Sequence, residues 1–220
     1  MSERQKKRVL VLTSTFPRWE GDTTPMFVAD LAQGMSERFD MTVLAPSSDG
    51  ARATERYGDV SVRRFRYGWP ARTQKLADGA ILPNIRRNRV LAAQAAPFVA
   101  AQFHAAWRLV RRERFDAIHA HWAIPQGVVA AIIKSRTGIP VLTTTHGADV
   151  YGLRAQPIVA MKLWALRRSD AITAVSTDLK REIVALGVDA ARVRVLPMGV
   201  DTQRFSPEHA SPELRERWPG

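Results

Sequence analysis

The stretch that decides the fold runs from Phe115 to Tyr151 and reads FDAIHAHWAIPQGVVAAIIKSRTGIPVLTTTHGADVY. Residues 115–122 and 140–146 are short, mainly apolar runs, which is typical of buried strands. Between them, residues 125–138 begin with Pro and end with Gly, the asymmetry expected of a helix. Strand, helix and strand in this order predict a βαβ unit with parallel strands.

The same alternation of strands and helices continues on both sides of this unit. Further strands are expected over 8–16, 41–46, 60–67 and 170–176, and a last strand and turn over 192–201. Further helices are expected over 26–38, 89–113, 157–168 and 176–187. Residues 68–88 are less regular, and Pro97 is expected to kink or divide helix 89–113. The predicted fold class is α/β, with a doubly wound, Rossmann-like parallel sheet that carries helices on both faces.

The composition limits the classes of protein to which this chain can belong. It has 220 residues, of which 45% are hydrophobic and 25% charged, as in ordinary globular domains. No apolar run approaches the roughly 20 residues of a membrane span. The basic start lacks the long apolar run and cleavage site of a signal peptide. The absence of cysteine excludes disulfides and thiolate chemistry and suits the cytoplasm.

The formal net charge of +12 predicts attraction to anions. Anionic membrane surfaces and phosphorylated substrates are expected partners, whereas no module for nucleic acid is recognisable. Residues 86–114 contain Phe98, Phe103 and Trp107 among arginines, and would fit a surface helix on anionic lipid. A core-packing helix with an arginine-rich solvent face is favoured, because alanine fills most of its apolar side.

Ligands of open α/β sheets bind outside the carboxyl ends of the strands, so the segments after each strand are the candidate sites. The first such loop contains Gly21, Asp22 and Thr23, whose backbone at a helix start could face a phosphate. An ordinary capped loop is the alternative. The loop is neither a GxGxxG motif nor a P-loop, which weakens a nicotinamide reading.

Two histidines, His119 and His121, alternate at the end of a strand and therefore point to the same side. With His146 and Asp149 they could bind zinc. Alternatively, Trp122 could stack on a sugar while His121 donates a hydrogen bond to it. The third interpretation is that a histidine packs in the core.

The segment from Thr145 to Asp149 reads THGAD. Gly147 would allow close approach of a ligand to the backbone. His146 could act as a general base or as a neutral donor to a hydroxyl. Asp149 could orient it, cap the next helix, or simply close a turn. A serine-hydrolase elbow is absent from the sequence.

Three segments, 16–46, 115–151 and 174–207, together resemble the N-terminal half of family 4 glycosyltransferases. The resemblance runs from about Val9 to Pro207 and includes the hinge-like PMGVDTQRF. It implies one half of a GT-B fold, in which two Rossmann-like domains face a cleft. Residues 1–196 would form the N-terminal domain, and 197–220 the hinge and the start of a C-terminal donor-binding domain.

The resemblance also implies an activity. Such enzymes transfer a sugar from a nucleotide sugar to a glycan or lipid-linked acceptor with retention of configuration, without a cofactor or a catalytic metal. The protein would be cytoplasmic and peripheral at the inner membrane face. The C-terminal donor domain would be a partner in cis or in trans, and this chain alone would be inactive or weak.

By the same resemblance, His146 is the expected catalytic residue, in contact with the donor sugar. The donor and phosphate side is assigned to Gly21, Asp22, Thr23, Gly147 and Asp149, and the acceptor side to Arg18, His121, Trp122 and Ser176. Met198 stands where the family commonly has Asn. The alternatives are a non-catalytic module that binds glycan or anionic lipid, and a metal-dependent hydrolase that uses His119, His121, His146 and Asp149.

Overall fold

A computed structural model describes residues 6–152, 154–203, 205–209 and 211–217. Its centre is an eight-stranded sheet in the order β3-β4-β2-β1-β5-β6-β7-β8. The strands are β1 (Lys7–Leu12), β2 (Phe39–Pro46), β3 (Thr54–Tyr57), β4 (Val60–Phe65), β5 (Ala117–His121), β6 (Val141–Thr145), β7 (Ala171–Ala174) and β8 (Val193–Val195). Neighbouring strands are parallel except for β3, which pairs antiparallel with β4 at the sheet edge.

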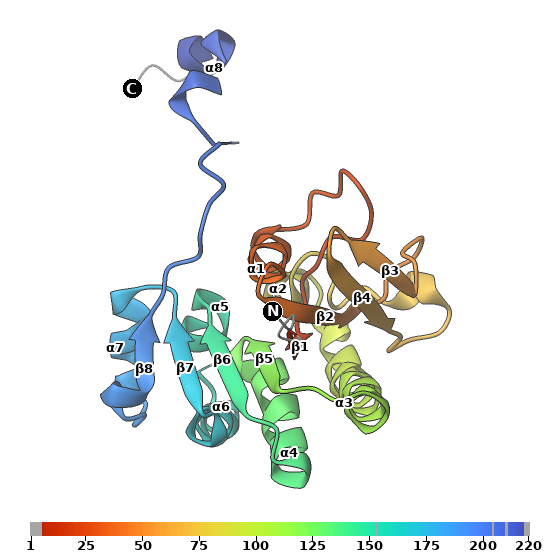
Figure 1. Cartoon of the computed structure of the whole chain (residues 1–220), viewed down its shortest axis with the longest axis vertical. Coiled ribbons are helices and arrows are strands. Elements are labelled where there is room, and N and C mark those ends of the chain that lie inside the picture. Colours follow the sequence, from red (N-terminus) through yellow and green to blue (C-terminus); the bar gives the residue numbers. More distant parts are fainter. Residues whose placement is uncertain (1–5, 153, 204, 210, 218–220) are drawn as a thin grey trace, which may run out of the picture.

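Helices cover both faces of this sheet, as predicted. They are α1 (Phe27–Met35), α2 (Ile81–Arg87), α3 (Ala95–Arg112), α4 (Val128–Thr137), α5 (Gly147–Tyr151), α6 (Gln156–Arg168), α7 (Thr177–Ala185) and α8 (Pro212–Arg217). Helices α3, α4 and α6 lie on one side of the row of strands and α1 on the other (Figure 1). The doubly wound α/β fold is therefore confirmed.

The core has two layers, because side chains of a strand alternate between the faces of the sheet. Leu10 and Leu12 of β1 pack with Phe98 of α3 on one face. Val9 and Val11 of the same strand pack with residues of α1 on the other. Each fully buried aliphatic side chain contributes roughly 1.5–3 kcal/mol, so this central strand is stabilised from both sides.

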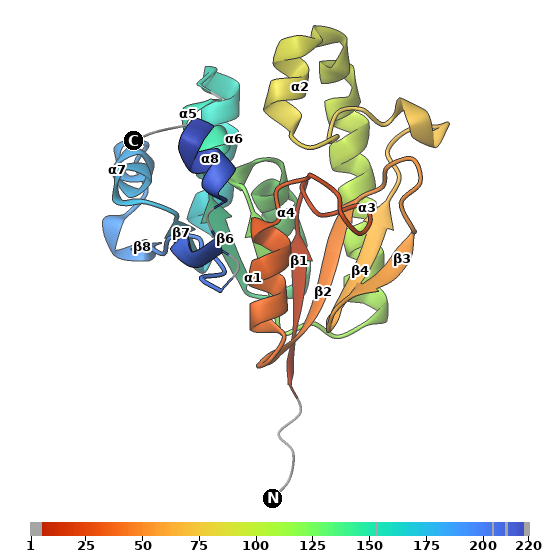
Figure 2. The ribbon, with the colours of Figure 1, turned by 90° about the horizontal axis from the view of Figure 1, so that it is seen from above.

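The order of the strands fixes where a ligand can bind. β1 has β2 on one side and β5 on the other, so the chain reverses its direction of winding between them. In open α/β sheets such a reversal leaves a crevice at the carboxyl ends of the strands. Helices α2 and α5 lie at this end of the sheet (Figure 2).

Some elements differ from the sequence-based expectations. The predicted helix 89–113 is divided into a 3-10 segment, Arg89–Gln94, and α3, with Pro97 in the first turn of α3, where its missing N–H is harmless. Strand β3 and helices α2 and α5 were not predicted. The last strand, Val193–Val195, lies within the predicted strand and turn over 192–201.

After β8 the chain leaves the sheet and ends in α8 (Figure 1). The division into domains 1–196 and 197–220 stays a prediction. Among the described residues, no helix is both long enough and apolar enough to cross a membrane.

Candidate functional site

Three buried imidazoles meet at the carboxyl ends of β5 and β6. His119 and His121 lie two residues apart in β5, and their ring centres are 4.3 Å from each other. His146 follows β6 directly, and its Nε2 lies 3.2 Å from Nδ1 of His121. The three residues are 3%, 1% and 8% exposed. The prediction that His119 and His121 point to the same side of the sheet is confirmed.

Two threonine hydroxyls form a chain of hydrogen bonds that ends on His119. Nε2 of His119 lies 2.7 Å from Oγ1 of Thr144, which in turn lies 2.7 Å from Oγ1 of Thr173. This chain gives a buried ring nitrogen the hydrogen-bond partner that burial demands. His119 is therefore held by the protein itself, whereas His121 and His146 lie nearer the edge. The supporting threonines were not singled out from the sequence.

Burial controls the protonation of these rings. Burial lowers the pKa of His119 and of His146 to about 4, and it lowers the pKa of His121 well below 6.5. The neighbouring imidazoles lower the pKa of His119 and of His121 further. All three rings are therefore neutral at pH 7. A base this weak is a poor general base at neutral pH. The geometry thus favours the neutral-donor alternative for His146.

The start of α5 and His121 together position the ring of His146. His146 precedes α5, and its backbone N–H donates to Oδ1 of Asp149 at 2.9 Å. Nε2 of His146 faces Nδ1 of His121 at 3.2 Å, so one of these two nitrogens carries a proton and donates to the other. This contact orients the ring of His146.

Asp149 links the two loops that carry the site. One carboxylate oxygen, Oδ2, accepts from the backbone N–H of Ala123 at 2.6 Å, and the other, Oδ1, from that of His146 at 2.9 Å. Burial raises the pKa of this carboxyl to about 7. Asp149 thus caps α5 and bonds two backbone amides, which fits both the capping and the turn alternatives from the sequence. Its assignment to the donor side stays a prediction.

Trp122 lies between the histidines and the first helix. Its ring centre is 4.7 Å from that of His146 and 5.9 Å from that of Phe27 in α1. Its backbone has φ +73°, the one positive φ outside glycine in the part of the chain that the structure describes. Such a backbone costs a side-chain-bearing residue roughly 1–3 kcal/mol and tends to occur at functional sites.

Ion pairs hold the first loop, one within it and one to Asp78. Arg18 bonds both carboxylate oxygens of Asp22, at 2.9 and 2.7 Å, and also bonds Asp78. The Arg18 guanidinium holds the pKa of the Asp22 carboxyl well below its usual range. Gly21 turns the loop with φ +76°. Asp22 and Asp78 therefore neutralise the charge of Arg18, and the acceptor-side role of Arg18 stays a prediction.

The remaining predicted residues of this loop and of β7 have simpler surroundings. Thr23 is exposed beside the Arg18–Asp22 pair. Oγ of Ser176 accepts from the backbone N–H of Leu179 at 3.1 Å and so caps α7. The donor-side role of Thr23 and the acceptor-side role of Ser176 stay predictions.

A cavity of about 270 Å³ opens beside Gly147, between α2 and α5. It is lined by Leu82, Pro83, Arg86, Gly147, Ala148, Tyr151 and Gly152. A Cβ on Gly147 would meet nothing of the protein closer than 3.5 Å, so packing does not require a glycine there. The sequence did not reveal the wall formed by α2, because 68–88 shows no helical periodicity.

The donor atoms of the cluster do not converge on a metal. Within residues 6–152 and the later described segments, no group of three or more His, Asp or Glu side chains could hold an ion. The nitrogens of His121 and His146 face each other, and both carboxylate oxygens of Asp149 accept backbone N–H groups. The hydrolase alternative is therefore not favoured.

Known proteins resemble this chain in sequence and in fold. Residues 25–204 match the model described as Glycosyltransferase Family 4. The chain is 29% identical over 219 residues to the GDP-mannose-dependent alpha-(1-6)-phosphatidylinositol monomannoside mannosyltransferase of Mycobacterium tuberculosis, with 96% of this chain and 49% of that protein covered. It is 30% identical over 118 residues to the N-acetyl-alpha-D-glucosaminyl L-malate synthase of Bacillus anthracis, with 52% and 31% covered.

A likeness of fold extends to solved structures. Anabaena HepE in complex with UDP-glucose matches with a TM-score of 0.57 at 18% identity, over 96% of this chain and 49% of that one. The chain thus spans about half the length, or less, of the relatives that it matches.

Proposed function

Because the chain belongs to glycosyltransferase family 4, we propose that it forms the acceptor-side half of an enzyme that transfers sugar from a nucleotide sugar to a glycan or lipid-linked acceptor, with retention of configuration. The observation that carries the proposal is the position of His146 and Gly147. They lie at the crevice edge of the sheet, beside an open cavity. The donor-binding half would be supplied by a C-terminal domain in cis or in trans.

On the donor side, the proposal rests on the neutral imidazole of His146. Retaining transfer develops charge on the leaving phosphate and on the sugar ring, which preorganised hydrogen-bond donors stabilise. A neutral ring can donate to a sugar hydroxyl from the nitrogen that carries its proton, without a change of protonation. The departing phosphate would accept the proton of the acceptor hydroxyl. The proposed reaction uses no cofactor and no catalytic metal.

On the acceptor side, the proposal adds the cavity between α2 and α5 to the residues expected from the sequence. Leu82, Pro83 and Tyr151 give it an apolar wall, and Arg86 adds one positive charge. This lining suits an acceptor with an apolar and an anionic part. The mycobacterial relative is named for a phosphatidylinositol monomannoside acceptor. The proposed location is the cytoplasmic face of the membrane, where the protein is peripheral.

A transfer assay tests the proposal. The chain, alone and mixed with a C-terminal donor-binding domain of family 4, is incubated with radiolabelled UDP- and GDP-sugars and a bacterial lipid extract. We expect labelled glycolipid with a retained anomeric centre only in the mixture or in the joined protein. Stoichiometric binding of a glycan or lipid without transfer under any of these conditions would favour the non-catalytic binding module instead.

A further inference from the structure

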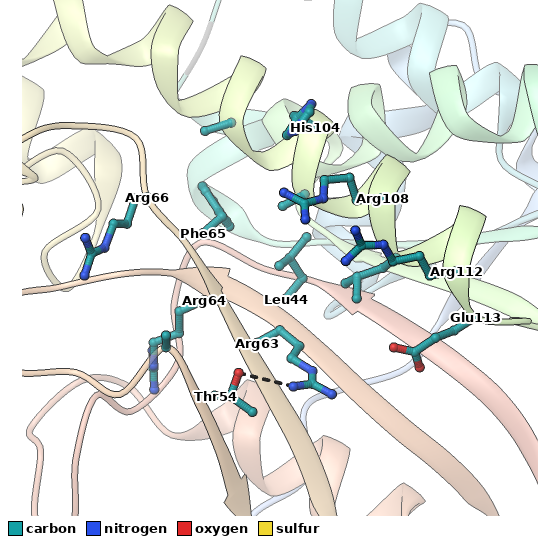
Figure 3. A pocket seen from close by; sticks show the side chains of 14 residues that line it. Leu44, Thr54, Arg63, Arg64, Phe65, Arg66, His104, Arg108, Arg112 and Glu113 are labelled. Carbon is teal, nitrogen blue, oxygen red and sulfur yellow. Dashed lines mark hydrogen bonds between the residues drawn. The ribbon is translucent and has the colours of Figure 1, made fainter.

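A second concave surface lies far from the histidine cluster. It is an open groove of about 710 Å³ on the α3 side of the outer sheet, between the second half of α3 and strands β3 and β4. Strands β2, β1 and β5 separate β4 from β6, so the groove does not belong to the site around His146. Figure 3 shows the side chains that line it.

Small residues of α3 create this groove. Ala101, Ala105 and Leu109 follow one another at intervals of four and therefore share one side of the helix. The two alanines leave space between the helix and the strands, and the floor is formed by Leu44 and Phe65. The floor is therefore apolar.

Arginines form the rim of the groove. Arg108 and Arg112 lie one helical turn apart on α3, across the groove from Arg63 of β4 (Figure 3). Like charges at this spacing destabilise a helix, so the pair is not explained by the stability of α3. Arg66 follows β4, and its guanidinium lies 5.7 Å from the ring centre of Trp69, which is 80% exposed.

Little negative charge opposes this rim. Glu113 is the one acid in the lining, and it is paired with Arg8 at 2.6 Å. Arg63 donates to the uncharged Thr54 at 3.2 Å. Among the described residues, no carboxylate pairs with Arg63, Arg108 or Arg112.

We propose that this groove docks the phosphate headgroup of an anionic phospholipid, and so holds the protein on a membrane surface. Guanidinium groups bind phosphate oxygens in pairs, and the apolar floor accepts the first carbons behind the headgroup. An exposed tryptophan beside the rim suits the boundary between water and lipid. Phe65 is only 4% exposed, so the floor offers no aromatic face on which nucleic-acid bases could stack.

Co-sedimentation with vesicles tests the proposal without any need for transferase activity. The full chain is mixed with vesicles of phosphatidylglycerol and phosphatidylcholine, or of phosphatidylcholine alone. We expect binding only to the anionic vesicles. The double variant R108Q/R112Q should bind these vesicles with an affinity about 30-fold lower, because each arginine at an anionic surface contributes about 1 kcal/mol. The matched control R181Q/R194Q removes the same charge from the exposed surface of α7 and β8 and should bind as before.

Several outcomes would overturn the proposal. Equal losses in the two double variants would mean that net charge alone drives binding. Displacement by millimolar glycerol 1-phosphate would indicate a site for a soluble anion. If R108Q/R112Q loses RNA binding while its vesicle binding is unchanged, the groove is a site for nucleic acid instead. If circular dichroism shows that R108Q/R112Q is unfolded, Arg63→Gln in β4 provides the second test. Its affinity for anionic vesicles should be about fivefold lower.

Discussion

At the scale of single residues, Trp122 shows most directly that the site is built at a cost in stability. Its φ of +73° is imposed by the turn out of β5, where its N–H donates to the carbonyl of Thr144 at 2.8 Å and its carbonyl accepts from Gly127 at 3.0 Å. These two bonds fix the backbone, and the ring then packs against His146. The strain is therefore tied to the position of the aromatic ring.

This strain can be measured with two variants that both lack the ring. Trp122→Gly and Trp122→Ala lose the same contacts, but only glycine adopts this backbone without a Cβ penalty. We expect the glycine variant to be more stable than the alanine variant by roughly 1–2 kcal/mol. Urea unfolding measures the difference. An alanine variant of equal or higher stability would show that the backbone is not strained.

Asp149 provides the second test at this scale. In Asp149→Asn an NH₂ group replaces one of the two oxygens that accept from Ala123 and His146. One buried backbone N–H then loses its partner, which costs roughly 1–3 kcal/mol. We expect a corresponding drop in the free energy of unfolding. Unchanged stability would contradict the assigned role of Asp149 as the link between the two loops.

The residues of the site were partly readable from the sequence. His119, His121, His146 and Asp149 were found because strand ends can be located, and the carboxyl ends of parallel strands meet at one edge. The hydrogen-bond partners of these residues could not be predicted from the sequence. Thr144 and Thr173 look like ordinary strand residues, and only the register of the strands brings their hydroxyls together.

At the scale of elements, the close packing of α2 against α5 shapes the cavity beside Gly147. Leu82 of α2 reaches Gly152, the residue after α5, so closely that an added Cβ would lie 2.7 Å from its Cδ1. The same Cβ would lie 2.6 Å from the carbonyl oxygen of Ala148. Gly152 therefore allows the two short helices to form opposite walls.

Replacing this glycine should separate the helices. We expect Gly152→Ala to lower the free energy of unfolding by roughly 1–3 kcal/mol, because overpacking forces the backbone to shift. Gly34→Ala is the matched control, since nothing lies within 4 Å of its Cβ position inside α1. That control should raise stability by roughly 0.5–1 kcal/mol. Equal effects of the two substitutions in denaturant titrations would contradict the packing described here.

Periodicity predicted the long elements and missed the short ones. The eighteen residues of α3 have a readable apolar face, whereas α5 has only five residues. α2 is held by a side chain, because Nδ2 of Asn84 donates to the carbonyls of Lys75, Leu76 and Asp78. The one available signal for β3 was Gly58-Asp59, a two-residue turn typical of a hairpin.

At the scale of the whole molecule, the buried imidazoles make folding sensitive to pH. The pKa of His119 and His146 is about 4 in the folded chain and 6.5 ordinarily, so the unfolded chain binds more protons between these values. Stability is then full above pH 6.5 and is lost as the pH falls toward 4. Asp149 acts in the opposite direction, because its raised pKa of about 7 makes the folded chain take up a proton between pH 7 and 3.8.

Three histidines outweigh one carboxyl, so the net effect of acid should be destabilising. We expect the free energy of unfolding to fall by a few kcal/mol, on the order of 2–4, between pH 7 and pH 4.5. Urea titrations at several pH values measure this slope. It should be shallower in His146→Asn, which removes one of the titrating groups, and a flat profile in the unaltered chain would contradict the burial of neutral imidazoles.

The most direct measurement of the central claim is the rate of sugar transfer by the protein that contains both halves, with and without His146. We predict that His146→Ala lowers kcat by roughly 10²–10³-fold, the usual effect of losing one preorganised donor. Arg181→Ala, on the exposed side of α7, is the control and should transfer sugar at the unaltered rate. Equal rates in the His146→Ala and unaltered proteins would contradict the account.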